Sequence, residues 1–472
     1  MNKNSSPGIK GLTFSFRGAL FLLSILLATF PAFAADTLTM DASDERAVFA
    51  WHFPGILQSA ENLTSNWVDL PQAVTSVTIP ITNGSVFYRV RKPLFMVVDT
   101  GQTNCYNNIG PITAPISGQP YYGQDPQYGG PGLSFTNNGD GTITDLNTGL
   151  MWVQARGSKI TWDTAVAGAT SDRTGGYTDW RMPTITECFS LIQFNGKNGT
   201  SGTNLAGYVP FIDTNYFDFV YGPGTSLSVG ERIVDCQDWS ATEYVSTTMG
   251  GQATVFGVNF ADGRIKGYNK YIPNTAVGNT LYVRYVRNNT AYGSNHYVNN
   301  ADGTVTDLAT ALMWSESDSG AGYDWPGALA WVQEQNAGSY LGYSDWRLPN
   351  IKELQGIVDY TRSPETTGSA AIDTNFLACT AITNEAGQPD YPYYWSSTIL
   401  LDGGPTPSGT YISFGRAMGY MNGAWIDVHG AGSQKSDILV GNPANYPYGR
   451  GPQGDAVRIY NYVRLVRGGL DS

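Results

Sequence analysis

An eleven-residue motif that occurs twice constrains the fold of this chain more than any other feature. Residues 177–187 (YTDWRMPTITE) align without a gap with residues 343–353 (YSDWRLPNIKE), and seven of the eleven positions are identical. Each motif joins a tight turn to the start of an amphipathic helix. A long motif repeated once at this spacing indicates a duplicated domain, in which each copy is built around its own anchor.

Four further blocks repeat in the same order. They are residues 135–152 and 297–314, 212–215 and 372–375, 239–242 and 395–398, and 282–287 and 462–467. An Asp-Gly pair in the first block predicts a hairpin of two short strands. A helix is expected to follow this hairpin in each copy. It starts near Thr161-Trp162 in the first copy, and Asp324 can cap it in the second. The lengths between blocks differ, so insertions fall in the loops 195–235, 262–280, 401–410 and 427–456. Loops on a rigid scaffold commonly carry specificity.

The acidic residue that ends each motif is a candidate catalytic group or a helix cap. Thr184-x-x-Glu187 is a capping box, and Asn350-x-x-Glu353 has a comparable arrangement, so we interpret both acids as structural. The arginine of each motif is expected to pair with Asp179 or Asp345, or with backbone carbonyls, and the alternative is a clamp for a ligand carboxylate. The predicted structural anchors are Asp179, Trp180, Arg181, Glu187, Asp345, Trp346, Arg347 and Glu353.

The first 34 residues have the pattern of a secretory signal peptide. Three basic residues precede an apolar run from Ala19 to Phe30, and Ala32-Phe33-Ala34 is a small-x-small cleavage site. We expect an exported protein that starts near Ala35 and has no transmembrane span. The predicted parts are a signal peptide (1–34), a small β-sandwich-like module (35–94), a Gly/Pro/Tyr-rich lead-in segment that wraps the first copy (95–133), the first copy (134–289) and the second copy (290–472).

Charge excludes one class of partner. Residues 1–34 hold three basic and no acidic residues, so the remainder has 24 basic and 39 acidic residues and a formal charge of −15. A chain this acidic is a poor match for nucleic acid and other polyanions, and a better match for cations or neutral ligands. The alternative interpretation is that the net negative charge serves only to keep the protein in solution.

Four cysteines in an exported chain can form two disulfides. Cys188 and Cys236 both lie in the first copy, and both are absent from the second, where Leu354 and Pro392 take their places. This joint absence predicts a Cys188–Cys236 disulfide. The pairing of Cys105 and Cys379 is left open.

Residues that support catalysis or metal binding are scarce. The three histidines (His52, His296 and His429) are solitary in sequence, and no glycine-rich phosphate loop opens a helix. The Asn-x-Asp-Gly segments around Asp140 and Asp302 offer oxygen ligands, but an EF-hand would need Glu where Gly149 stands. A hairpin turn is the favoured interpretation, no cofactor is predicted, and calcium in another geometry stays possible.

The ordered motifs Asp-Gly-Thr-x-Thr-Asp, Asp-Trp-Arg-Leu-Pro-x-x-x-Glu-Leu, Trp-Ser-Ser-Thr and Tyr-Val-Arg-x-Val-Arg resemble the Lcl C-terminal domain family, in two tandem copies over residues 130–469. They are also similar to the C-type-lectin-like and formylglycine-generating-enzyme superfamily. The resemblance implies an α+β fold: two tandem lectin-like domains, each with small antiparallel sheets, two helices and long loops. Some members of the family bind host glycans. The copper-binding cysteines of the formylglycine enzymes have no counterpart in the closing segment of either copy.

The leading hypothesis is an exported, non-catalytic binding or adhesion protein that recognises a glycan or another cell-surface ligand through its loops. The alternatives are an enzyme with a diverged site in the cleft between the copies, which predicts a clustered and non-repeated polar set with perturbed titration, and an envelope structural or assembly protein. Positions that differ between the copies are free to carry specificity. The predicted ligand contacts are Glu243, Tyr244, Arg264, Tyr268, Arg416, Tyr420, Trp425 and Asp427.

Overall fold

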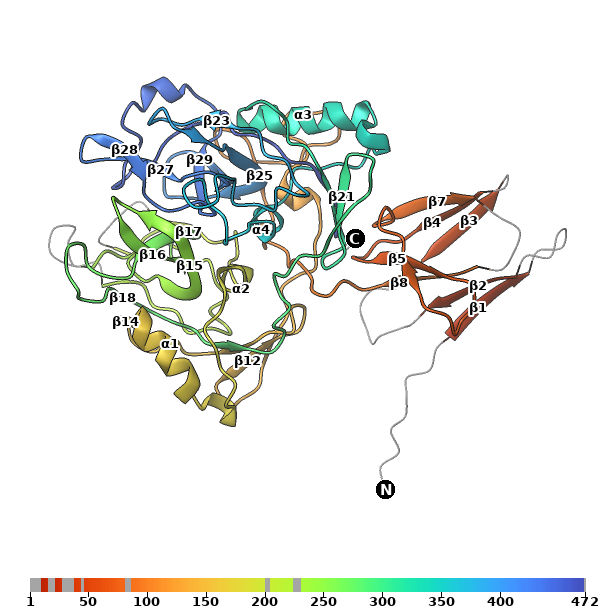
Figure 1. The fold of residues 1–472 in the computed structure, drawn as a ribbon, viewed down its shortest axis with the longest axis horizontal. Helices are drawn as coiled ribbons and strands as arrows, with labels where there is room; N and C mark the ends of the chain where they lie inside the picture. Colours follow the sequence, from red (N-terminus) through yellow and green to blue (C-terminus); the bar gives the residue numbers. More distant parts are fainter. Residues whose placement is uncertain are drawn as a thin grey trace.

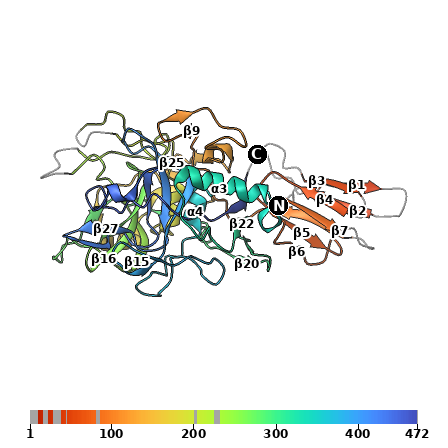
Figure 2. The same ribbon diagram turned by 90° about the horizontal axis from the view of Figure 1, so that it is seen from above.

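The computed structural model describes residues 10–15, 22–27, 38–43, 46–80, 86–199, 204–223 and 231–470. A small β module lies at one end of the long axis and the two copies lie side by side at the other (Figures 1 and 2). Within the predicted signal peptide the structure describes only β1 (Lys10–Ser15) and β2 (Leu22–Leu27); the rest of that prediction lies outside the described residues.

The N-terminal module is all β, as predicted. One sheet has the order β3 (Thr39–Ser43), β4 (Arg46–Ala50), β7 (Ser76–Pro80), and the other has the order β1, β2, β8 (Phe87–Arg91), β5 (Ile56–Ala60), β6 (Val68–Asp69). Side chains of β4 alternate between solvent and core, the period-two pattern of a half-buried strand. Phe49, Trp51 and Leu57 fill the small core that results.

The lead-in segment contains β9 (Cys105–Tyr106), β10 (Pro111–Ile112) and the 3-10 turn η1 (Asp125–Gln127). The prediction that it wraps the first copy is wrong, because it lies between the copies. Its Thr100 carbonyl accepts from the Phe194 N–H of the first copy at 2.7 Å, and its Gln102 side chain exchanges two hydrogen bonds with the Ile399 backbone of the second. The reason is that these polar side chains complete an edge of the second copy.

Each copy is an α+β domain with two α-helices, as predicted. The first contains the sheet β11 (Phe135–Asn137), β12 (Thr142–Asp145), β13 (Met151–Val153), β19 (Val286–Arg287), the pair β14 (Ile160–Thr161), β18 (Thr280–Leu281), the strands β15 (Asp238–Thr248), β16 (Gln252–Asn259), β17 (Arg264–Asn269), the helices α1 (Trp162–Ser171), α2 (Ile185–Ser190), and η2 (Thr174–Gly176).

The second copy repeats this order, except that an isolated bridge between Tyr323 and Asn461 replaces the β14–β18 pair and that another strand pair and a hairpin are added. It contains the sheet β20 (Tyr297–Asn299), β21 (Thr304–Asp307), β22 (Leu312–Ser315), β30 (Val466–Gly468), the pair β23 (Ile382–Thr383), β24 (Pro389–Asp390), the strands β25 (Tyr393–Leu400), β26 (Ser408–Ser413), β29 (Gln434–Ile438), the hairpin β27 (Met418–Met421), β28 (Ala424–Asp427), the helices α3 (Trp325–Ala337), α4 (Ile351–Gly356), and η3 (Tyr340–Gly342), η4 (Pro443–Asn445). Asp324 caps α3 as predicted, through a bond from the Gly327 N–H.

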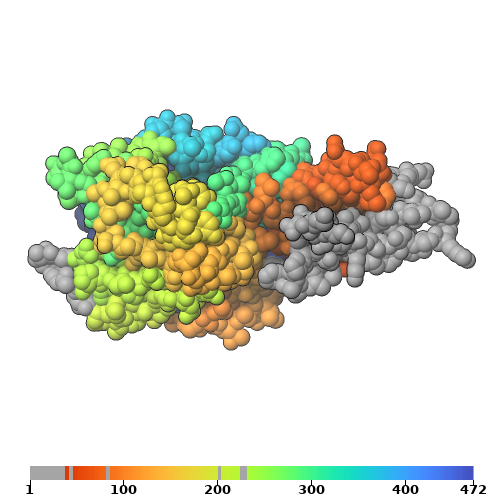
Figure 3. All heavy atoms as spheres, turned by 90° about the horizontal axis from the view of Figure 1, so that it is seen from below, coloured from red at the N-terminus to blue at the C-terminus, as the bar shows by residue number. Residues whose placement is uncertain are grey.

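The two copies share one six-stranded sheet, which the sequence did not indicate. Its order is β15-β16-β17-β29-β26-β25, so the strands of the first copy are followed by their counterparts in reverse. The copies meet where β17 pairs antiparallel with β29, with Ile265 opposite Gln434. The Gly267 N–H adds a bond of 3.0 Å to the His429 carbonyl. In the space-filling view the copies form one continuous body beside the N-terminal module (Figure 3).

The repeated motif forms a capping box and a two-pronged ion pair in the first copy. The Thr184 hydroxyl accepts from the Glu187 N–H, and the Glu187 carboxylate accepts from the Thr184 N–H. The same carboxylate accepts two bonds from Arg181, at 2.7 and 2.5 Å. The prediction that Asp179 pairs with this arginine is wrong, because Asp179 binds Arg287 of the closing strand, at 2.7 Å.

The second copy has the same arrangement and buries it more deeply. Arg347 donates to both oxygens of Glu353, at 2.5 and 2.6 Å, and their side chains are 2% and 4% exposed. Asn350 caps α4, and Asp345 pairs with Arg467 instead of the predicted Arg347. In both copies the motif therefore ties a helix start to the closing strand, and the buried Trp180 and Trp346 pack beneath it.

All four cysteines are unpaired in the structure, and the predicted Cys188–Cys236 disulfide is not formed. Cys188 lies on the buried face of α2, while Cys236 precedes β15 and its thiol contacts Asn259. The joint absence of these two cysteines from the second copy was therefore not a sign that they pair. Each cysteine fills a separate buried position in the first copy. We expect the denatured, non-reduced protein to react with four equivalents of a thiol reagent. Fewer than four would contradict the structure.

Candidate functional site

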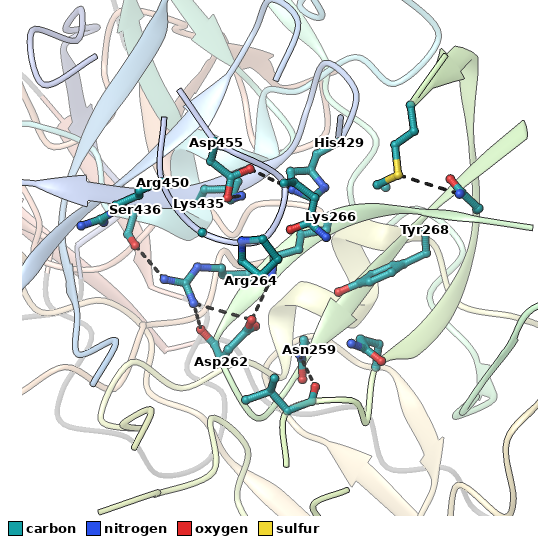
Figure 4. Close-up of a pocket in the computed structure, with 18 of the residues that line it drawn as sticks. Asn259, Asp262, Arg264, Lys266, Tyr268, His429, Lys435, Ser436, Arg450 and Asp455 are labelled. Atoms are coloured by element: carbon teal, nitrogen blue, oxygen red, sulfur yellow. Dashed lines mark hydrogen bonds and ion pairs between the residues drawn. The ribbon is translucent and has the colours of Figure 1, made fainter. Parts of the chain in front are cut away.

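A pocket of about 550 Å³ lies at the junction of the two copies, over β16, β17, β29 and the segment 449–457 (Figure 4). Its ionisable lining residues include both acids and bases and come from both copies: Arg232, Asp262, Arg264, Lys266, Asp402, His429, Lys435, Asp437, Arg450 and Asp455. The aromatic rings of Tyr268, Tyr271 and Tyr411 also line it. The pocket depends on the contact between β17 and β29, so neither copy has it alone.

The turn between β16 and β17 positions the charges that the first copy contributes. Gly263 takes φ of +67°, and a Cβ there would lie 2.6 Å from the Phe211 ring, so both conformation and space require glycine. The turn puts Asp262 and Arg264 on either side of this glycine. The Asp262 carboxylate accepts from Lys266 at 3.0 Å, and Arg264 donates to the Ser436 hydroxyl of β29 at 3.0 Å. These contacts fasten the floor of the pocket across the junction.

The second copy contributes a buried cluster of three titratable groups. Asp455 contacts the Lys435 ammonium and accepts from the His429 Nε2 at 3.1 Å. Burial lowers the pKa of Lys435 to about 8, although Asp455 opposes the shift. Burial also lowers the pKa of His429 to about 4, so the ring is neutral near pH 7. Despite its own burial, Asp455 has a lowered pKa because Lys435 and His429 stabilise its charge.

Several buried polar atoms at this pocket have no hydrogen-bond partner among the described residues. They are Asn198 Oδ1, Asp262 Oδ1, Tyr268 Oη, Asn269 Oδ1 and His429 Nδ1. Figure 4 shows the Tyr268 ring extending from β17 toward the centre of the pocket. An unsatisfied buried polar group costs roughly 1–3 kcal/mol, so we expect water or a polar ligand to supply partners for these atoms.

The predicted ligand contacts separate into several places. Arg264 and Tyr268 line the pocket. Glu243 lies outside it, on an exposed edge where Lys270 reaches it at 3.2 Å. The Tyr420 ring contacts both Trp425, edge-on at a centroid separation of 5.5 Å, and Tyr448, tilted at 4.8 Å. These last three residues, the aromatic trio, adjoin the pocket rim through the Tyr420 N–H bond to Gly454.

Three other predicted contacts form a buried cluster away from the pocket lining. Tyr244 donates to Asp427 at 2.9 Å, and Arg416 pairs with Glu365, which Tyr244 also reaches at 3.3 Å. Burial raises the pKa of Asp427 to about 7. Tyr244 and Asp427 are 6% and 9% exposed. This cluster joins β15 of the first copy to β28 of the second, so its contacts hold the two copies together.

Sequence reasoning missed most of the pocket. The sequence pattern did not single out Lys435 or Asp455, and His429 was set aside because it is solitary in sequence. Their one available signal was their place in or beside the inserted loop 427–456 of the second copy. Their proximity to Asp262 and Lys266 depends on the pairing of β17 with β29, which periodicity and spacing do not show.

The carboxylates of the Asn-x-Asp-Gly segments serve their own turns. Asp140 Oδ1 accepts from the Thr142 N–H and hydroxyl, and Asp302 does the same for Thr304. Within the described part of the chain, no three His, Cys, Asp or Glu side chains gather as a metal site would require. The described residues also include no helix long and apolar enough to span a membrane.

A second hollow, of about 760 Å³, lies between the lead-in segment, α3 and the end of the chain. Its walls include Asp345 and Trp346. Both belong to the anchor that holds the closing strand, so this hollow has fewer side chains available for a ligand than the pocket at the junction.

The fold and the pocket together define a protein with a duplicated α+β domain and a candidate binding pocket at the junction of the two copies. The family model of the Lcl C-terminal domain matches residues 141–287 and 303–424, which is more than half of the chain. The chain therefore belongs to the Lcl C-terminal domain family, in two tandem copies, as its motifs predicted. Comparison with curated proteins and with solved structures gave no match.

Proposed function

We propose that this protein is an exported, non-catalytic binding protein that takes a glycan, or another polar cell-surface ligand, into the pocket between its two copies. One observation carries the proposal: five of the side chains that line the pocket hold a buried polar atom without a partner among the described residues, and three tyrosine rings also line it. Sugar sites combine hydrogen-bonding groups that fix orientation with aromatic faces that pack on the ring. We further propose that each copy has the C-type-lectin-like fold.

The direct test is a glycan array probed with the full exported chain, with and without calcium. We expect concentration-dependent binding to a subset of glycans, and the same subset in both conditions if calcium plays no part. An array with no glycan above background in either condition would contradict the function. Export is tested separately by N-terminal sequencing of the protein recovered outside the cytoplasm, for which we expect Ala35 as the first residue.

The aromatic trio extends the proposed site beyond the pocket. Replacing Trp425 with alanine is expected to weaken binding of an array-selected oligosaccharide by roughly tenfold, because a lost aromatic contact of about 1.4 kcal/mol corresponds to that factor. Isothermal titration calorimetry measures the change. Trp67→Ala is the matched control, since it removes an indole that packs on Arg89 in the N-terminal module. Equal losses in the two variants would argue against the trio as a binding surface.

A second candidate function is an enzyme that acts on the bound glycan. The cluster of Lys435, Asp455 and His429 favours it, because a buried lysine with a pKa near neutrality can accept or transfer a proton. Proton NMR of each array-selected glycan, incubated with the protein for days, distinguishes the functions. Chemical conversion that Lys435→Met abolishes would support the enzyme, and unchanged spectra would support binding alone.

A further inference from the structure

Each basic side chain that lines the pocket already has a carboxylate partner, although the chain as a whole is acidic. The pairs, all within 4.0 Å, are Arg232 with Asp235, Arg264 with Asp262 and Asp402, Lys266 with Asp262, Lys435 with Asp455, and Arg450 with Asp402. An anionic ligand would have to compete with these carboxylates for the basic groups. A cationic ligand would meet the clustered ammonium and guanidinium groups of Lys266, Lys435 and Arg264.

The atoms left open are mainly acceptors. Burial acts to raise the pKa of Asp262, but Lys266 and Arg264 outweigh it and the net pKa is lowered, so Asp262 Oδ1 is an ionised acceptor without a donor. His429 is neutral, and its Nε2 faces the ionised Asp455. The shared proton must therefore be on Nε2, which leaves Nδ1 as a bare acceptor. Asn198 Oδ1 and Asn269 Oδ1 add a third and a fourth acceptor.

Tyr268 supplies the complementary group. Burial raises the pKa of its hydroxyl well above the ordinary value, so the proton stays on the oxygen. The hydroxyl can therefore donate to one ligand oxygen and accept from another. A ligand that satisfies this set must donate several hydrogen bonds and accept at least one, without carrying charge.

We propose that the pocket binds a neutral, hydroxyl-rich sugar ring, in which adjacent hydroxyls donate to Asp262 and His429 and accept from Tyr268. This inference rests on the proposed function and narrows its ligand class. Sulfated or carboxylated sugars and amino sugars are the excluded alternatives.

The test compares ligands that share a ring and differ in charge. Methyl glycosides of glucose, galactose and mannose are titrated against the full exported chain, beside glucuronate, galactose 6-sulfate and glucosamine, at low and high sodium chloride. At least one neutral glycoside is expected to bind at least tenfold tighter than its charged analogue, and salt is expected to change its affinity less than twofold, since no counterions are released. Saturation-transfer NMR detects weak binding.

A pair of tyrosine variants assigns the binding to this pocket. Tyr268→Phe removes only the hydroxyl and is expected to weaken binding of the neutral glycoside by five- to tenfold. Tyr221→Phe is the control, because its hydroxyl is also buried without a partner but does not line the pocket. The affinity of the Tyr221→Phe variant for the neutral glycoside is expected to equal that of the wild type.

The outcomes separate the two claims. Tighter, salt-sensitive binding of a charged analogue that Tyr268→Phe weakens would overturn the neutral-ligand inference and leave the binding function standing. No binding by any sugar of the panel, together with an empty glycan array, would overturn both. Neutral binding that Tyr268→Phe and Tyr221→Phe leave equally unchanged would place the sugar elsewhere and also overturn the inference.

Discussion

Replacing Arg347 with methionine is expected to lower the free energy of unfolding by about 3–5 kcal/mol, the cost of leaving one partner of a buried ion pair alone. The remaining Glu353 carboxylate is 4% exposed and would keep only the Asn350 N–H as a donor. The variant also removes the bond from Arg347 to the Gly468 carbonyl, at 2.8 Å, which holds the closing strand. Urea unfolding followed by tryptophan fluorescence measures the loss, because buried indoles of this copy report on its packing.

The duplication provides a matched control for this variant. Arg181→Met breaks the equivalent pair in the first copy, where the Glu187 carboxylate left behind is only 2% exposed but the Arg181 side chain is 30% exposed, against 2% for Arg347. Because water can reach the place that the Arg181 guanidinium leaves, we expect a smaller loss there, of about 1–3 kcal/mol. Equal losses in the two variants, or a larger loss for Arg181→Met, would show that the exposure of the arginine does not set the strength of these pairs.

Local features of the anchors could be predicted from sequence, whereas their long-range partners could not. The capping boxes follow from residues three apart, such as Thr184 and Glu187, and the structure contains both. Of the two partners predicted for the arginine, the nearby acid was wrong, because Asp179 binds an arginine 108 positions later in the chain. The backbone carbonyl was right, because Arg181 donates to the Asn288 carbonyl. A turn brings Arg181 and Glu187 together, and a closing strand brings Arg287 to Asp179. Only the first of these contacts is visible in local spacing.

The pocket illustrates the same limit more strongly. Comparing the copies directed attention to non-repeated positions, and two of them, Arg264 and Tyr268, line the pocket. The comparison treated the copies as separate domains, so it could not indicate that β17 pairs with β29. That pairing brings Lys435 toward Asp262 and makes a single site from two loops. Two copies of one fold meeting edge to edge form a surface that neither sequence encodes alone.

Replacing Asp427 with asparagine is expected to stabilise the protein above pH 7. Burial raises the pKa of Asp427 to about 7, and nearby Glu365 and Asp390 act in the same direction, while bonds from Gly430 and Tyr244 oppose them. The unfolded pKa is about 3.9. Between pH 4 and 7 the folded state therefore holds a proton that the unfolded state has lost, and stability falls as pH rises. Over the full window this one group costs about 4 kcal/mol, an order-of-magnitude value.

Asparagine cannot ionise, so this cost is absent from the variant. Its oxygen can accept from the Gly430 N–H, and its amide can donate to Tyr244, whose hydroxyl then turns to Glu365. After these exchanges we expect a gain of about 1–3 kcal/mol at pH 8 and a shallower decline between pH 4 and 7. Some decline remains, because Asp125 also has a pKa of about 7. Urea unfolding at several pH values gives both quantities.

A control of opposite sign completes the test. Burial acts to raise the pKa of Asp318, but hydrogen bonds from Thr380 and Tyr394 outweigh it and the net pKa is lowered, so its charge stabilises the fold above pH 4. Asp318→Asn is therefore expected to reduce stability at pH 8, whereas Asp427→Asn increases it. A loss of stability at pH 8 in both variants would mean that the pKa of Asp427 is not raised in the folded protein and that the contacts at the junction between β15 and β28 stabilise its charge.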